Sequence, residues 1–304
     1  MPVVEAPIAR RAVERAARGD RTKDLLFKSS LLLCLLVAVA FLAALLATTI
    51  NDGAGRLSLD FITEFPSRIN PETAGVRSAL LGTLYLMALC ALFIVPVGVA
   101  SAVYLEEYAD AKRWWNRLIE TNIQNLAAVP SVVYGILGLA FIVRGPIDIF
   151  GLGVGQPTLL AGALTLGLLV LPVVIIVSRE AIRAVPPSIR EGSLALGATQ
   201  WQTIWKQVLP GALPGIATGV ILALSRAIGE TAPLILVGAV ANARFNPSID
   251  GAFSALPAQI LNAVGESRDE FQTLAAAAIL VLLVILLLMN SVAIFLRNRY
   301  ETKW

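Results

Sequence analysis

The chain has 304 residues and a net charge of +3, and 57% of its residues are hydrophobic while only 15% are charged. Soluble domains carry roughly 25% charged residues, so this composition excludes a disordered chain, a nucleic-acid-binding domain and an ordinary soluble enzyme. The lack of any histidine excludes histidine-based zinc sites, a Ser–His–Asp triad and imidazole acid–base chemistry. We therefore expect no catalytic residues and no metal site in this chain.

Uncharged apolar stretches predict six membrane-spanning helices, because a bilayer core of about 30 Å needs about 20 apolar residues in a helix. The predicted spans are 29–50, 78–104, 122–143, 159–178, 212–238 and 273–296. A further apolar stretch, 253–264, predicts a short helix that is either interfacial or re-entrant. The predicted fold class is an all-α integral membrane protein with six transmembrane helices.

The distribution of Lys and Arg predicts the orientation of these helices, since cytoplasmic loops are enriched in both. If both termini are cytoplasmic, 17 of the 24 Lys and Arg residues lie inside, six lie outside and Arg226 lies within a span. The organisation expected from this count is a basic cytoplasmic tail (1–28), an uncleaved first helix (29–50), an extracytoplasmic loop (51–75), a core (76–296) and a cytoplasmic C-terminal tail (297–304).

The cytoplasmic loop before the fifth span has the pattern of two short helices joined by a turn. Pro186-Pro187-Ser188 predicts a helix start near residue 187, and Gly197 suits the left-handed position after a helix. Thr199 and Gln202 have the spacing of a capping box that starts a second helix. We interpret residues 186–210 as a docking element on the cytoplasmic face.

Four apolar residues follow the capping box at i, i+3, i+4 and i+7, which predicts one apolar face: Trp201, Ile204, Trp205 and Val208. This face fits two interpretations. It either docks onto a protein partner or lies on lipid headgroups with its tryptophans in the interface.

The fifth span carries a small residue at every fourth position, in Gly211, Gly215, Gly219, Ala223 and Ala227. Such a stripe lets another helix backbone approach closely, so we expect these residues to mediate helix packing.

Two charges, Arg226 and Glu230, border this stripe within the same span. Their i,i+4 spacing predicts an ion pair, and a charge inside a bilayer costs about 2.5–3.5 kcal/mol, so we expect both side chains in the bundle interior. One interpretation is a pair that holds two helices together. The other is an anion site, in which the planar fork of Arg226 binds an oxyanion and Glu230 neutralises and orients the empty guanidinium.

The loop 186–210 resembles the EAA loop of ABC-importer permeases. Glu191, Gly197, Leu209 and Pro210 fall at the matching positions, whereas Gly192-Ser193 replaces Ala-Ala and Gln207 replaces the usual Ile. The resemblance implies that this loop is the coupling helix that seats in an ATPase subunit, with Thr199 and Trp201 as part of the docking element.

Several further segments resemble the phosphate-specific ABC permeases of the PstA/PstC type. They are Arg226-Ala-Ile-Gly-Glu230-Thr231-Ala-Pro233, Gly82-Thr83-Leu84, Tyr104-Leu-Glu106-Glu107-Tyr-Ala109 and Pro130-Ser-Val-Val-Tyr134-Gly135. The resemblance implies a type I ABC-importer permease fold and a phosphate pathway that includes Arg226, Glu230 and Thr231. The chain length favours the PstA-like partner.

The resemblance also implies the partners: a homologous second permease, two ABC ATPase subunits, an extracytoplasmic phosphate-binding protein and the lipid of a bacterial plasma membrane, with no nucleic acid. None of the five lysines follows a glycine, so the chain lacks a Walker A loop. We expect no cofactor in this chain, with ATP and Mg²⁺ bound by the partner ATPase.

Three other functions fit less well: an ABC permease for sulfate or molybdate, a stand-alone secondary transporter or channel, and a membrane scaffold.

Two smaller expectations concern residues near the ends of the spans. Glu106, Glu107 and Asp110 are expected to form a solvated face at the end of the second span. Pro130 and Tyr134 are expected to mark a kinked helix with an interfacial aromatic residue.

Overall fold

The computed structural model describes residues 7–110, 112–145 and 156–300, and within the helices it describes side chains from Lys23 onward except at 293, 296 and 300. All regular structure in these residues is helical, which confirms the all-α fold class. Parts of the predicted terminal tails lie outside the described residues. The chain divides into two compact units, Met1–Asn51 and Asp52–Trp304.

The first unit consists of one long helix, α1 (Pro7–Gly53), which runs on into the start of the second unit. Its apolar part, Lys23–Arg56, is long and hydrophobic enough to span a bilayer and contains the predicted span 29–50. The helix continues through residue 28 without a break.

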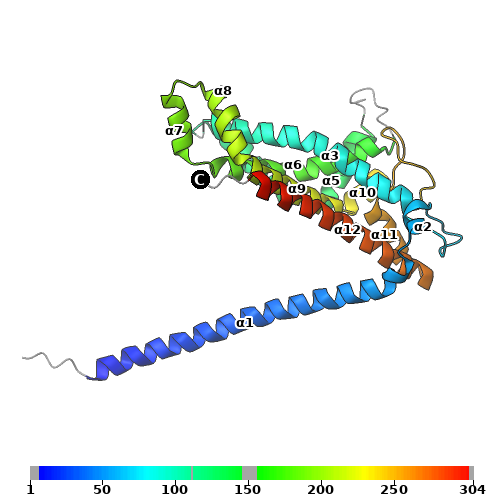
Figure 1. The fold of residues 1–304 in the computed structure, drawn as a ribbon, viewed down its shortest axis with the longest axis horizontal. Helices are drawn as coiled ribbons and strands as arrows, with labels where there is room; N and C mark the ends of the chain where they lie inside the picture. The colour runs from blue at the N-terminus through cyan, green and yellow to red at the C-terminus, as the bar shows by residue number, and fades with distance from the viewer. Residues whose placement is uncertain (1–6, 111, 146–155, 301–304) are drawn as a thin grey trace, which may run out of the picture. The chain divides into compact units, whose positions relative to one another are not determined.

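Four long helices form the body of the second unit: α3 (Arg77–Val103), α6 (Leu159–Arg183), α9 (Leu209–Ile228) and α12 (Asp269–Tyr300). Helix α6 packs between α3 and α9, and α12 packs along α9 (Figure 1). The predicted spans 78–104, 159–178 and 273–296 fall within the helical stretches Arg77–Tyr108, Leu159–Arg183 and Asp269–Arg299, each of which is apolar enough to cross a membrane.

The third predicted span is not one straight helix. The segment 122–143 belongs to two helices, α4 (Trp114–Ala127) and the helix formed by α5 (Ser131–Leu137) and the π-helical η3 (Gly138–Val143), which meet at an angle of 105°. The break falls at Pro130, which has no N–H to continue the α4 ladder and disfavours a helical conformation in the residue before it. Counted with this bent pair, the described residues hold up to six spans.

The fifth predicted span, 212–238, also differs from the structure. The observed helix begins earlier, because α8 (Gln200–Thr203) and the π-helical η5 (Ile204–Val208) run directly into α9, and it ends at Ile228. Residues 229–231 separate α9 from α10 (Ala232–Val237), which starts with Pro233 in its first turn.

Short helices lie at the two ends of this second unit (Figure 1). At one end are α2 (Leu59–Thr63) and α11 (Leu256–Val264), which follow the turn η1 (Ala54–Arg56) and the loop after α10. At the opposite end are α7 (Pro187–Ala195) and α8. The short helix predicted at 253–264 is therefore present, and it buries one side against α3 and α12.

Candidate functional site

The two charges predicted within the fifth span lie where α9 ends. Arg226 belongs to the last turn of α9, and Glu230 lies in the break before α10. The N–H groups of Gly229 and Glu230 donate to the carbonyl groups of Arg226 and Ala227, so the helix closes with tight i→i+3 turns. Nε of Arg226 lies 3.8 Å from Oε1 of Glu230, which is the contact expected from their i,i+4 spacing.

The two side chains differ in exposure. Glu230 is 19% exposed, but Arg226 is 64% exposed, so the helices of this chain alone do not bury Arg226 as they bury Glu230. Helices α6 and α12 cover other faces of α9, and this chain alone does not enclose the guanidinium group. Because a charge in hydrocarbon costs about 2.5–3.5 kcal/mol, protein or water is favoured over lipid beside Arg226.

A small cavity lies beneath the pair. Its other walls come from the end of α4, the middle of α6 and Ala223 of α9, and its volume is about 10 Å³. That volume holds roughly one water molecule, which is too small for an oxyanion. Thr231, expected beside this path, lies in the break next to Glu230, and its hydroxyl is 3.5 Å from the carbonyl oxygen of Gly229.

The small-residue stripe of α9 faces α6 within this chain. A Cβ atom at Gly215 would lie 2.8 Å from Cβ of Ala181, and one at Gly219 would lie 2.6 Å from a methyl carbon of Val177. Farther along the stripe Ala223 and Ala227 are buried, and at its beginning Gly211 is half-buried. The absence of side chains at 215 and 219 thus sets how closely α9 and α6 approach.

The loop 186–210 contains the two short helices and the turn that its sequence predicts. Helix α7 ends in a Schellman motif, in which Gly197 N–H donates to the carbonyl of Leu194 and Ala198 N–H to that of Ser193. Gly197 has φ +87°, a conformation that favours glycine. Thr199 and Gln202 form both hydrogen bonds of a capping box at the start of α8.

The apolar face predicted after the capping box is divided in the structure. Ile204 and Val208 are fully buried, whereas Trp201 and Trp205 are exposed and contact each other with ring centroids 5.2 Å apart and ring planes tilted by 55°. The reason is η5, because a π-turn adds a residue to the helical repeat, so i, i+3, i+4 and i+7 no longer share one face. Ile204 and Val208 therefore anchor the helix in the core, and Trp201 and Trp205 face outward.

The remaining residues of the predicted docking element line the same end of the molecule. Glu191 is exposed on α7, and Leu196, beside the turn, is 91% exposed. Leu209 and Pro210 occupy the first turn of α9, where Leu209 packs against the core and Pro210 is exposed. The exposed apolar residues around Gly197 form what we call the docking tip: Leu194, Leu196, Trp201 and Trp205.

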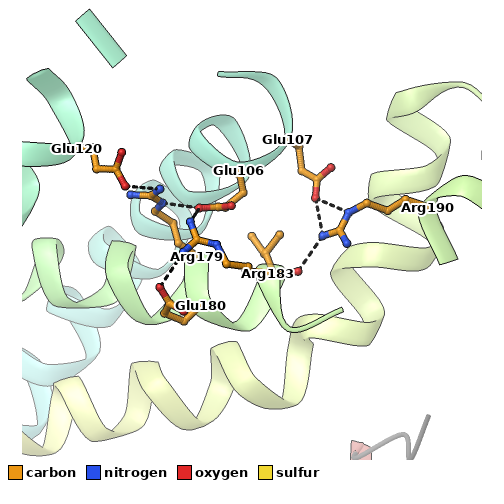
Figure 2. Close-up of polar contacts among 8 residues, drawn as sticks. Glu106, Glu107, Glu120, Arg179, Glu180, Arg183 and Arg190 are labelled. Carbon is orange, nitrogen blue, oxygen red and sulfur yellow. Dashed lines mark hydrogen bonds and ion pairs between the residues drawn. The ribbon is translucent and has the colours of Figure 1, made fainter. Parts of the chain in front are cut away.

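The expectation of a solvated acidic face after α3 is wrong for Glu106 and Glu107. Both belong to the π-helical turn η2 (Tyr104–Tyr108), and their side chains are 14% and 10% exposed. Figure 2 shows them in a network of ion pairs with arginines of α6 and α7. Asp110, by contrast, is half-exposed and lies 3.8 Å from Arg113. The acidic pair is neutralised by arginines distant in sequence, and this is why it tolerates burial.

Sequence reasoning missed this network, although a signal for it was present. Glu106 and Glu107 follow one uncharged stretch, and Arg179 and Arg183 follow another, so opposite charges collect at the ends of two neighbouring spans. In the predicted topology both spans end on the cytoplasmic side. Glutamates at one end and arginines at the other were therefore candidates for ion pairs.

Other segments quoted above hold helices together. A side chain at Gly82 would collide with the backbone of Ser254, and the hydroxyl of Thr83 accepts the N–H of Leu256 at 2.9 Å, at the start of α11. Tyr134 is buried, so its side chain packs inside the chain. Its hydroxyl donates to the carbonyl of Leu126 at 2.9 Å, across the bend between α4 and α5.

The arrangement of helices matches solved transporters. The structure aligns with a bacterial alginate ABC transporter in complex with alginate pentasaccharide-bound periplasmic protein, with TM-score 0.67 and 20% identity over 94% of this chain and 98% of that chain. At this level of identity the likeness concerns the fold.

Two relatives with described transport roles are similar in sequence. The phosphate transport system permease protein PstC of Xylella fastidiosa (strain 9a5c) is 31% identical over 280 residues, covering 84% of each chain. The phosphate transport system permease protein PstA 1 of Mycobacterium tuberculosis (strain H37Rv) is 38% identical over 165 residues, covering 54% of this chain and 51% of its own. Both permease types are thus among the relatives.

The candidate spans make this a multi-pass membrane protein, and its fold is that of a chain of a solved ABC transporter. Residues 94–302 match the model of the binding-protein-dependent transport system inner membrane component family. The chain belongs to that family and is an ABC importer permease.

Proposed function

We propose that this chain is one of two transmembrane permease subunits of an ATP-driven importer of inorganic phosphate in a bacterial plasma membrane. The observation that carries the proposal is the charge pair at the end of α9, where one guanidinium is 64% exposed and only loosely held by a carboxylate 3.8 Å away. The similarity to phosphate permeases of both types supports phosphate as the substrate. The PstA-like position stays a prediction from chain length.

Arg226 supplies the chemistry that an oxyanion needs. A guanidinium is always charged and presents a planar fork that matches two phosphate oxygens. Glu230 opposes an anion, but it also neutralises Arg226 while the path is empty. Because the observed contact is long, an arriving phosphate competes for the guanidinium without breaking a short ion pair.

The second permease completes the site. The cavity under Arg226 holds about 10 Å³ in this chain, so an oxyanion needs a wall that another subunit supplies. The same subunit shields Arg226 from lipid. This requirement fits the expectation of a homologous partner lying against the exposed side of the guanidinium.

The docking tip is the part of the chain that would meet the ATPase. It presents four exposed apolar side chains around a fixed turn, and α8 connects it through η5 to α9 without a break. We place it in the cytoplasm with both termini, facing two ATPase subunits that bind ATP and Mg²⁺. An extracytoplasmic phosphate-binding protein delivers the substrate at the end that carries α2 and α11.

An external energy source is consistent with the substrate. Moving an anion into a cell that is negative inside costs about 2.3 kcal/mol per charge for each 100 mV of membrane potential. Accumulating phosphate against that potential therefore requires a drive such as ATP hydrolysis.

The experiment is phosphate uptake into membrane vesicles by the complex carrying Arg226→Leu with Glu230→Leu, alongside the yield of assembled complex in detergent. Replacing both charges avoids leaving one unpaired, so we expect normal yield and lost uptake. Arg226→Lys should also lower uptake, since an ammonium does not reproduce the fork. Uptake near the wild-type rate in the double variant would contradict the anion site and favour a helix staple.

The matched control lies one residue away. The hydroxyl of Ser225 donates to Oδ1 of Asn290 on α12 at 2.8 Å, an uncharged polar pair on the same helix. Ser225→Ala with Asn290→Leu removes a polar pair from the span without removing a charge. Uptake in this control should stay near the wild-type rate.

A further inference from the structure

We propose that Glu107 is a positioning residue of the transport cycle, which locks the loop 186–210 onto the end of α3. A displacement of the docking tip would then move α3 and α6 as well as α9. The inference rests on the proposed function, because it concerns how ATP-driven motion enters the membrane helices.

The side chain of Glu107 holds the first arm of the loop. Its Oε1 accepts hydrogen bonds from Nε and Nη2 of Arg190 on α7, at 3.1 and 2.9 Å. The two side chains are 10% and 23% exposed. Partial burial lowers the local dielectric and strengthens the pair relative to a surface salt bridge, whose net contribution is small.

The backbone of the same residue holds the second arm. The carbonyl of Glu107 accepts a hydrogen bond from Nε2 of Gln200 at 2.6 Å, and Gln200 is the first residue of α8. One residue at the end of α3 thus contacts the helix before the Gly197 turn and the helix after it. The loop cannot move away from α3 without breaking both contacts.

Arg190 extends the connection to α6. It donates to the carbonyl of Ile182 in the last turn of α6 at 2.8 Å and to that of Val185, just beyond this helix, at 2.7 Å. The carbonyl of Ile182 also accepts the N–H of Val185, and a cation at this end of α6 is favoured by the helix dipole. Arg190 therefore joins α7, the end of α6 and the end of α3.

Glu106 holds the end of α3 that carries Glu107 against α6. Its Oε1 accepts Nε of Arg179 at 2.8 Å and Nη2 of Arg183 at 2.7 Å, and Arg179 also donates to Glu120 of α4 at 2.9 Å (Figure 2). The consecutive glutamates of η2 therefore have separate tasks. Glu106 fastens α3 to α6 and α4, and Glu107 fastens the loop to α3.

The test measures phosphate transported per ATP hydrolysed by the purified complex with its binding protein in proteoliposomes. Glu107→Gln removes the charge but keeps the size of the side chain and the backbone carbonyl. We expect normal complex yield, ATP hydrolysis near the wild-type rate, and a transport ratio lowered by about fivefold or more, the lower end of the range for coupled sites. Glu107→Asp, which keeps the charge, should recover part of that ratio.

The matched control is Glu180→Gln, the same substitution at an exposed pair. Glu180 lies 3.4 Å from Arg183, and both side chains are more than half exposed. Its ratio should equal that of the wild type. A proportional fall of transport and hydrolysis in Glu107→Gln, or an unchanged ratio, would overturn the proposal.

A second variant covers a failure of Glu107→Gln to assemble. Gln200→Ala removes only the contact to the backbone of Glu107 and leaves the ion pair intact, so it should also lower the ratio. A wild-type ratio in Gln200→Ala would overturn the two-armed lock. If the wild-type complex moves sulfate or molybdate instead of phosphate, the substrate assignment fails, and the ratio is measured with that anion.

Discussion

Gly197 provides a direct test of the docking tip, because its backbone conformation can be separated from its lack of a side chain. A Cβ atom at this position would meet nothing within 4 Å, so a substitution causes no clash within the chain. The cost comes from φ +87° alone. Holding a β-branched residue in this region costs of order 1–3 kcal/mol.

We expect Gly197→Val to relieve this strain by leaving the left-handed conformation. This change weakens the two Schellman hydrogen bonds and alters the direction of α8. A strain of about 1–3 kcal/mol corresponds to an about 5- to 150-fold smaller population of the docking conformation. The assay is the amount of ATPase that co-purifies with the tagged chain in mild detergent, together with phosphate uptake in vesicles.

Gly197→Asn is the matched control, because asparagine is close to valine in size and tolerates the left-handed region. The Asn variant should retain most of the ATPase that the Val variant loses. Equal losses in the two variants would show that a side chain at 197 meets the partner, and the backbone argument would be refuted. Normal docking and uptake in Gly197→Val would refute the coupling role of the loop.

Three further substitutions test how the helices are held. Gly219→Leu places a side chain where even a Cβ lies 2.6 Å from Val177, so it should separate α9 from α6 and lower complex yield. Tyr134→Phe removes the hydrogen bond to Leu126 across the bend and should lower the free energy of unfolding by about 1 kcal/mol, measured as a lower melting temperature in detergent. Thr83→Val leaves the first N–H of α11 without its acceptor and should destabilise the protein by about 1–3 kcal/mol, while Thr83→Ser should not.

Unbroken apolar stretches were the most predictable part of the fold. The spans 78–104, 159–178 and 273–296 correspond to α3, α6 and α12, because hydropathy alone identifies an uninterrupted apolar helix. Hydropathy does not report where the chain bends or where a helix ends. The chain bends by 105° between Ala127 and Ser131, and α9 ends at Ile228, and hydropathy marks neither position.

Features made by near neighbours in sequence were predictable to the residue. The Gly197 turn and the Thr199–Gln202 capping box depend only on local backbone geometry and short polar side chains. The partners of Glu106 and Glu107 were not predictable in this way, because Arg179 and Arg190 lie more than 70 residues farther along the chain. The exposure of Arg226 depends on which elements cover α9. The sequence of this chain alone does not reveal which elements these are.

The most direct test of the account is ATP-driven uptake of labelled phosphate into proteoliposomes by the complex purified on this chain, with its ATPase and binding protein. We predict uptake that requires ATP, is competed by unlabelled phosphate and not by sulfate or molybdate, and is lost in Arg226→Leu with Glu230→Leu. Uptake that proceeds without ATP, or that prefers another oxyanion, would contradict the assignment of this chain to a phosphate importer.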